Sequence, residues 1–228
     1  MFGVAYVKLS SRSFVVIGLG SFGSTIAAEL SLMGNDVLGI DIDENIIKAQ
    51  SDAIPNTAIL DARDEVALLE AGVANYNVVI ISIGENLEAS LLTVMSVKAL
   101  GVDEIWVKAK SKAHHTILQG IGVTKIIHPE RDMGIRVAEK LNSPNLSDYI
   151  FLNNNQYVIH LQAGRDFTSQ SVVDFIGAKK LSINILGYMN NNEFVCSSSD
   201  EFILNTPFNG VVVVGHKTEL RQLGAFLL

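Results

Sequence analysis

The sequence is poor in cysteine and in basic side chains. Its one cysteine, Cys196, excludes an intrachain disulfide framework and a metal site built from several cysteines, and it fits a reducing cytoplasm. Its 17 lysines and arginines are outnumbered by 24 acidic residues. A nucleic-acid surface needs clustered positive charge, so this balance argues against a nucleic-acid partner.

Long apolar runs are also absent. A membrane-spanning helix needs about 18 or more apolar residues in succession, and the longest clean run, 78–83, has only the length of a strand. Residues 1–13 carry some apolar character, but neither a signal-peptide core nor a small-residue cleavage pattern. We therefore expect a soluble protein that acts at a membrane only by docking onto another protein.

The sequence does contain regularly alternating strand-like and helix-like segments over its first 140 or so residues. We expect strands at 14–18, 36–41, 56–60, 77–83, 104–108 and 125–128. We expect helices between them at 22–33, 44–52, 64–71, 86–99, 111–120 and 130–141. The strands are nearly continuous apolar runs, which is typical of a parallel sheet covered on both faces. The pattern predicts an α/β domain with a doubly wound parallel sheet over 14–141.

The pattern changes after Leu141. The segment 142–145, Asn-Ser-Pro-Asn, is typical of a helix stop or linker. Shorter strands are expected at 148–152, 156–162, 184–189, 194–196 and 211–215, with helices near 169–176 and 217–226. The sequence therefore predicts three parts: an extension over 1–13, the α/β domain, and a small α+β domain over 142–228.

The most informative segment is the glycine turn after the first expected strand. Gly18, Gly20 and Gly23 form a GxGxxG pattern between a strand and a helix, and the next strand ends on Asp41. In a Rossmann-like fold these glycines permit the turn, the approach of a pyrophosphate and close helix packing, while the carboxylate binds a ribose. The pattern indicates a bound adenine nucleotide, and a purely structural glycine turn is the alternative.

Signatures of catalysis are missing. The sequence has no suitably placed Tyr-x-x-x-Lys pair, no GxxxxGK[ST] loop and no His/Cys cluster with zinc spacing. His160 and His216 are best interpreted as polar residues in or beside strands. His114 and His115 point about 100° apart on a helix, which disfavours joint chelation. We expect a nucleotide-binding protein that is not an enzyme; a small NAD(P)-dependent oxidoreductase is the alternative.

Several short segments are typical of one family. The sequences IGLGSFG at 17–23, IGENLEAS at 83–90, IWVKA at 105–109 and IHPERDMG at 127–134 resemble successive blocks of the RCK domain, also called KTN. The match is to the cytosolic A-type subunit of Ktr/Trk-type potassium transporters and covers nearly the whole chain. The resemblance implies that 142–228 is the family's small C-terminal domain, RCK-C.

The resemblance also implies a function. Such subunits form rings, commonly octamers built from dimers, beneath a membrane-embedded potassium-transport subunit at the inner face of the cell membrane. Exchange of ATP against ADP changes the ring and thereby transport, because a ligand shifts an equilibrium by its differential affinity for two states. Some relatives bind a cyclic dinucleotide in the C-terminal domain, but no strong motif indicates this here.

Site residues follow from the same resemblance. The phosphates would lie on the turn and first helix, the ribose on Asp41, and Glu130 would help to hold Mg²⁺ or Ca²⁺ near the phosphates. The full expected set is Gly18, Leu19, Gly20, Ser21, Phe22, Gly23, Asp41, Asp43, Asp61, Ala62, Ile83, Gly84, Glu85, Lys108 and Glu130.

Four of these residues also have plain structural interpretations. Asp43 could cap the next helix, and Glu85 could be a solvated loop acid. Lys108 could be a surface lysine, and Glu130 could be a first-turn acid favoured by the helix dipole.

The sequence departs from the family at two places. Ser21 stands where the family usually has arginine, which predicts weaker triphosphate binding or competition by NAD(H). Leu60 and Arg63 replace the usual glycine and threonine around Asp61, so the adenine edge of the site is expected to be altered.

Overall fold

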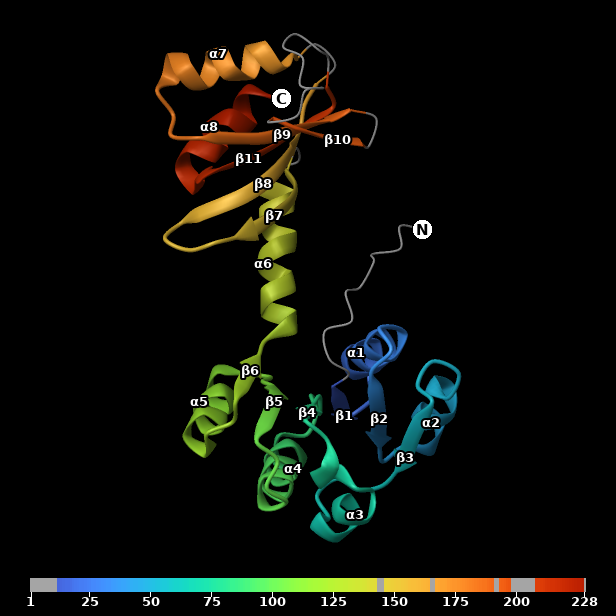
Figure 1. The fold of residues 1–228 in the computed structure, drawn as a ribbon. Coiled ribbons are helices and arrows are strands. Elements are labelled where there is room, and N and C mark those ends of the chain that lie inside the picture. The colour runs from blue at the N-terminus through green and yellow to red at the C-terminus, as the bar shows by residue number, and fades with distance from the viewer. Residues whose placement is uncertain (1–11, 143–145, 165–166, 191–192, 198–207, 228) are drawn as a thin grey trace. The chain divides into compact units, whose positions relative to one another are not determined.

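The chain folds into two compact units. The computed structural model describes residues 12–142, 146–164, 167–190, 193–197 and 208–227. The first unit ends at Glu130 and the second begins at Arg131 (Figure 1). Helix α6 (Pro129–Asn142) therefore begins in one unit and continues in the other. The functional boundary expected at 141/142 stays a proposal. Most of the expected extension and most of the 142–145 linker lie outside the described residues.

The first unit contains the predicted parallel sheet. Its strands are β1 (Ser13–Ile17), β2 (Asp36–Asp41), β3 (Asn56–Ile59), β4 (Val78–Ile81), β5 (Glu104–Lys108) and β6 (Lys125–Ile127). They follow the order β3-β2-β1-β4-β5-β6, and every neighbouring pair is parallel. This confirms the Rossmann-like fold. Strand order reverses between β1 and β4, so the crevice at their carboxyl ends is where such folds bind ligands.

Helices cover both faces of this sheet. Figure 1 shows α1 (Ser21–Leu32) and α2 (Glu44–Gln50) on one side, with α3 (Glu65–Glu70), α4 (Leu87–Ala99) and α5 (Lys112–Ile121) on the other. Alternate residues of β1 serve the two layers: Val15 and Ile17 pack in the α3–α5 layer, and Val16 packs in the α1–α2 layer. A short 3₁₀ helix, η1 (Val73–Asn75), was not expected from the sequence.

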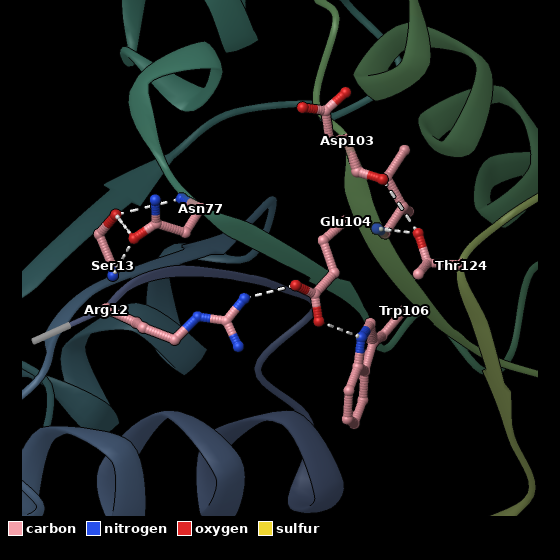
Figure 2. Close-up of polar contacts among 8 residues, drawn as sticks. Arg12, Ser13, Asn77, Asp103, Glu104, Trp106 and Thr124 are labelled. Atoms are coloured by element: carbon pink, nitrogen blue, oxygen red, sulfur yellow. Dashed lines mark hydrogen bonds and ion pairs between the residues drawn. The ribbon is translucent and has the colours of Figure 1, made fainter. Parts of the chain in front are cut away.

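A polar network connects residues at the amino ends of the strands of this sheet (Figure 2). The guanidinium of Arg12 forms an ion pair with Glu104, whose second carboxylate oxygen accepts a 3.0 Å hydrogen bond from the indole of Trp106. Nearby, the backbone N–H of Ser13 donates to the side-chain oxygen of Asn77 at 2.9 Å. Because all six strands run parallel, these amino ends lie opposite the glycine turn.

The second unit is a small α+β domain, as predicted. Its strands are β7 (Leu146–Phe151), β8 (Gln156–Gln162), β9 (Asn184–Asn190), β10 (Glu193–Cys196) and β11 (Gly210–His216). They form an antiparallel sheet in the order β10-β9-β11-β8-β7. Helices α7 (Ser169–Lys179) and α8 (Lys217–Phe226) supply Val172, Leu220 and Leu223 to one shared core with strands β8 and β11.

A polar cluster links α6 to the rest of the second unit. The ammonium of Lys217 donates to Glu139 at 2.7 Å, and Tyr149 also donates to that carboxylate. Burial, followed by this hydrogen bond, raises the pKa of Tyr149 to about 12. In the part of the chain that the structure describes, α6 contributes no buried residue. Its exposed apolar side chains are Met133, Ile135, Val137 and Leu141.

Among the described residues, no helix combines the length and the hydrophobicity needed to cross a bilayer.

Candidate functional site

The glycine turn has the tight geometry that its sequence predicts. Gly18 has a φ of +88°, and its N–H donates to the carbonyl of Ile40 at 2.8 Å. A Cβ atom on Gly23 would lie 1.9 Å from the carbonyl oxygen of Gly18, so α1 can approach the turn only with glycine here. A Cβ atom on Gly20, by contrast, would have no atom of the described residues within 4 Å other than those of its chain neighbours. The turn is therefore closed toward the sheet and open at Gly20.

The amino end of α1 is left available to an anion. Gly20 is its N-cap and offers no side chain, and no acidic residue lies in the first turn. Helices α2 and α4, in contrast, are capped by Asp43 and Asn86. The first N–H groups of α1, including those of Ser21 and Phe22, have no partner within the helix. Together with the helix dipole, they form a site suited to phosphate.

Asp41 connects the end of β2 to the glycine turn. One carboxylate oxygen accepts the N–H of Leu19 at 2.7 Å, and the other accepts the N–H of Asp43 at 3.0 Å. These bonds fix the carboxylate beside the turn, where a ribose attached to the phosphates would lie. Asp43 itself accepts the N–H of Asn45 at 2.8 Å, so its side chain is a helix cap in this structure.

The side chain of Lys108 lies close to three other expected residues. Its ammonium lies 2.5 Å from a carboxylate oxygen of Glu130, 5.7 Å from the ring centroid of Phe22, and 3.3 Å from the place where a Cβ on Gly84 would be. The Lys108 side chain is only 14% exposed, whereas that of Glu130 is 69% exposed. Lys108 is thus a largely buried cation beside the amino end of α1, not a surface lysine.

The remaining expected residues are more dispersed. Ala62 is buried, and Ile83 packs partly buried against the same core. Glu85 is fully solvated and pairs with Lys110 at 3.1 Å. Asp61 forms an ion pair with Arg63. The structure therefore brings together the residues expected to bind the phosphates and the ribose. The other expected residues have contacts elsewhere.

One contributor was missed from the sequence. Ser82 lies just past β4, and its carbonyl carbon would be 3.1 Å from a Cβ on Gly18. Its own Cβ would be 3.1 Å from a Cβ on Gly23. Ser82 thus forms the floor under both glycines. Its small size at the end of a run of larger apolar residues is the signal that could have identified it.

The described residues of this chain offer only part of the ligand set that a divalent cation needs. Among the described residues, no group of three or more histidine, cysteine or acidic side chains could hold a metal ion. Glu130 offers one well-exposed carboxylate, and the hydrogen bond from Lys108 lowers its pKa. A hard cation here fits only if phosphate oxygens supply further ligands.

Comparison with known proteins agrees with this geometry. Residues 14–129 match the TrkA-N domain. The Ktr system potassium uptake protein A of Bacillus subtilis is 36% identical over 94% of this chain and 96% of its own length. The GsuK RCK domain superposes with a TM-score of 0.63 at 13% identity, over 97% of this chain and 49% of the other. The AMP-bound form of the Kef C-terminal domain from Shewanella denitrificans gives a TM-score of 0.51 at 22% identity, over 60% of this chain and 84% of the other.

The two structures support the fold alone, because their identities are low. The Bacillus subtilis relative supports more, because the match is close and spans nearly both chains. The chain belongs to the family of the Ktr potassium uptake proteins, with a TrkA-N domain over residues 14–129.

Proposed function

We propose that this chain is a cytosolic regulatory subunit that gates a membrane-embedded potassium transporter in response to bound ATP or ADP. The observation that carries the proposal is the open amino end of α1 beside the largely buried Lys108. A relative that spans almost the whole chain is named a potassium uptake protein, which supplies the transport context.

Membership of this family confirms that the chain is not an enzyme. The same relationship gives it a regulatory role in potassium transport. The alternative, a small NAD(P)-dependent oxidoreductase, would need a proton-transfer residue beside the glycine turn. Of the described titratable groups beside the turn, Asp41 is held by two backbone N–H groups, and Lys108 is paired with Glu130.

In this proposal the phosphates lie on Gly18–Gly23. The backbone N–H groups of Ser21 and Phe22 donate to them, and the open space at Gly20 admits them. The buried Leu19 anchors the turn, and its N–H orients Asp41. Asp41 still has lone pairs for ribose hydroxyls, because each oxygen accepts one hydrogen bond from the described residues and can accept about two.

Lys108 supplies the cation that Ser21 does not. An arriving phosphate would draw the ammonium away from Glu130, since a polyphosphate carries more charge than one carboxylate. Glu130 would then be free to face a cation, and Mg²⁺ or Ca²⁺ would offset repulsion between phosphates. Ile83 and Gly84 would line this space next to Lys108.

The other expected residues have smaller roles here. Asp61 and Ala62 follow β3, at the end of the site that would hold the base. Asp43 and Glu85 would contribute only at the margin of the site, because Asp43 caps a helix and Glu85 pairs with Lys110. The missing arginine at Ser21 leaves room for NAD(H) as a competing ligand.

The assembly would be a ring of dimers, most simply an octamer, attached peripherally to the inner face of the cell membrane through the transport subunit. The exposed apolar side chains of Met133, Val137 and Leu141 lie four residues apart on α6 and support contact with another copy, because an exposed apolar row is usually covered in a functional assembly. ATP and ADP would shift the ring only as far as they bind its two states differently.

Potassium uptake tests the proposal. Transport-deficient cells would express the membrane subunit alone, with this chain, or with its Lys48→Ala variant as a folded control. We expect uptake to depend on this chain in both of the last two cases. Equal uptake with and without the chain would refute the regulatory role. Calorimetry with ATP, ADP and NADH would then rank the ligands; exclusive binding of NADH with turnover would favour the enzyme.

A further inference from the structure

Arg63 and Asp61 form a closed ion pair just beyond the end of β3. The backbone N–H of Arg63 donates to Asp61 Oδ1 at 3.0 Å. Its Nε donates to Oδ1 at 2.9 Å and to Oδ2 at 3.0 Å, and Nη2 donates to Oδ2 at 2.5 Å. Three N–H groups of this one arginine thus engage both oxygens of a carboxylate that has about four acceptor positions. These bonds from Arg63 lower the pKa of Asp61, which stays ionised.

The pair lies at the base end of the proposed site. In the sheet, β1 carries the glycine turn, β2 carries Asp41 at its end, and β3 is the next strand outward. The N–H of Leu60 donates to the backbone carbonyl of Asp41 at 3.2 Å, so Asp61 directly follows a residue that is paired with the ribose-side strand end. A nucleotide with phosphates at β1 and ribose at β2 would therefore direct its base toward Asp61 and Arg63.

The charge around this end disfavours a ligand with an extra phosphate on its ribose. Asp41 and Asp43 lie at the end of β2, and Asp61 follows β3. Arg63 is the nearby cation, but Asp61 neutralises it and Glu88 also acts on it. The Arg63–Asp61 pair would therefore lie next to the base and not next to a second phosphate.

We infer that Arg63 removes Asp61 from base recognition, so that this site binds purine nucleotides with weak discrimination at position 6 of the base. The inference rests on the proposed nucleotide site. A free carboxylate accepts an N–H from the 6-amino group of adenine and repels the 6-carbonyl of hypoxanthine. A carboxylate whose acceptors and charge are engaged by a guanidinium does neither.

The strength of the pair sets the size of the effect. Both side chains are partly exposed, at 44% for Arg63 and 36% for Asp61. Exposed ion pairs contribute at most about 1 kcal/mol, which corresponds to a change of about fivefold in affinity. Removing Arg63 should therefore restore adenine preference by about that factor.

The test compares ATP with inosine triphosphate on the full chain by calorimetry. Four proteins are needed: the wild type, Arg63→Thr, the double variant Arg63→Thr/Asp61→Ala, and Lys48→Ala as a matched control that breaks the exposed pair of Lys48 with Glu44. The ratio of the two dissociation constants is the readout, because a loss of folded protein affects both ligands equally.

We expect a ratio within about twofold of one for the wild type and Lys48→Ala, a rise of about fivefold for Arg63→Thr, and a return to the wild-type ratio in the double variant. A wild type that already prefers ATP by more than about tenfold, or an unchanged ratio in Arg63→Thr, would overturn the inference while leaving the nucleotide site intact. A wild type that binds neither nucleotide would overturn the proposed function and this inference with it.

Discussion

The ammonium of Lys108 lies 2.5 Å from a carboxylate oxygen of Glu130, and this ion pair connects the last residue of β5 with the first turn of α6. The lysine is largely buried beside the ring of Phe22, and the glutamate is mostly exposed. A ligand that attracts the lysine would therefore free the glutamate, and with it one restraint on the start of α6.

The two substitutions that break this pair, one at Glu130 and one at Lys108, should change nucleotide affinity in opposite directions. Without divalent cations, Glu130→Gln should strengthen ADP binding by about fivefold, because Lys108 loses its competing partner. Lys108→Met should weaken ADP binding by about tenfold or more, because a charged hydrogen bond to phosphate is lost. Calorimetry measures both, with Glu44→Gln as the control because it removes an exposed partner of Lys48 elsewhere. Unchanged affinity in both site variants would contradict the proposal that Lys108 leaves Glu130 to bind a phosphate.

Gly23 and Gly20 should respond differently to the same substitution. Gly23→Ala would force a Cβ to within 1.9 Å of the Gly18 carbonyl oxygen, and it should cost about 1–3 kcal/mol of unfolding free energy or more. The added Cβ of Gly20→Ala meets no atom of the described residues within 4 Å beyond its chain neighbours, and Gly20 has an ordinary φ of −61°, so stability should change by about 0.5 kcal/mol or less. Its added methyl group should nevertheless weaken ADP binding.

Urea unfolding and ADP calorimetry on the two glycine variants separate these effects. The contrast fails if Gly20→Ala unfolds as easily as Gly23→Ala, or if it binds ADP as the wild type does.

His114 should make the first unit sensitive to acid. Its side chain is buried, and its Nδ1 accepts the N–H of Lys110 at 3.3 Å. Burial, followed by the charge of nearby His128, lowers the pKa of His114 below the ordinary histidine value of 6.5. The unfolded chain then binds more protons than the folded one, so stability should fall as pH decreases below about 6.5.

His114→Asn keeps an acceptor in the place of Nδ1 but cannot titrate. The slope of unfolding free energy against pH should therefore flatten in this variant between about pH 7 and 5. His216→Asn, in the second unit, serves as the control and should keep the wild-type slope. An unaltered slope in His114→Asn would show that another group senses the acid.

The apolar face of α6 should govern assembly. Val137 is 50% exposed, and replacing it with glutamate would place a charge in any contact between copies. We expect Val137→Glu to reduce the molar mass measured by light scattering, whereas Val173→Glu, a similarly exposed valine on α7, should not. An equal mass for Val137→Glu and the wild type would exclude α6 from the interface.

The sequence predicts the first unit well because its signals are local. Apolar runs bounded by glycine, asparagine and aspartate locate all six strands of the parallel sheet to within about two residues.

In the second unit, the sequence predicts the end of α7 three residues early, at 176 instead of Lys179. The helix stops where Lys180 adopts a φ of +53°, a position where no glycine marks the stop.

The candidate site was predictable only in part. The glycine turn and Asp41 follow from spacing, because backbone geometry requires those residue types there. The roles of Asp43 and Lys108 were not decided by spacing, because a cap and a ligand contact need the same side chains. The closed pair of Arg63 with Asp61 depends on how two side chains turn toward each other, and no periodic pattern encodes that.

Trp106 gives the protein an internal optical probe. It is the chain's single tryptophan, and it is tied to Glu104 at the edge of the sheet opposite the glycine turn (Figure 2). The ammonium of Lys125 lies 4.5 Å from its ring centroid. Indole emission therefore reports melting of the first unit alone, without a signal from the second. Set against circular dichroism of the whole chain, it would reveal whether the two units unfold together or in sequence.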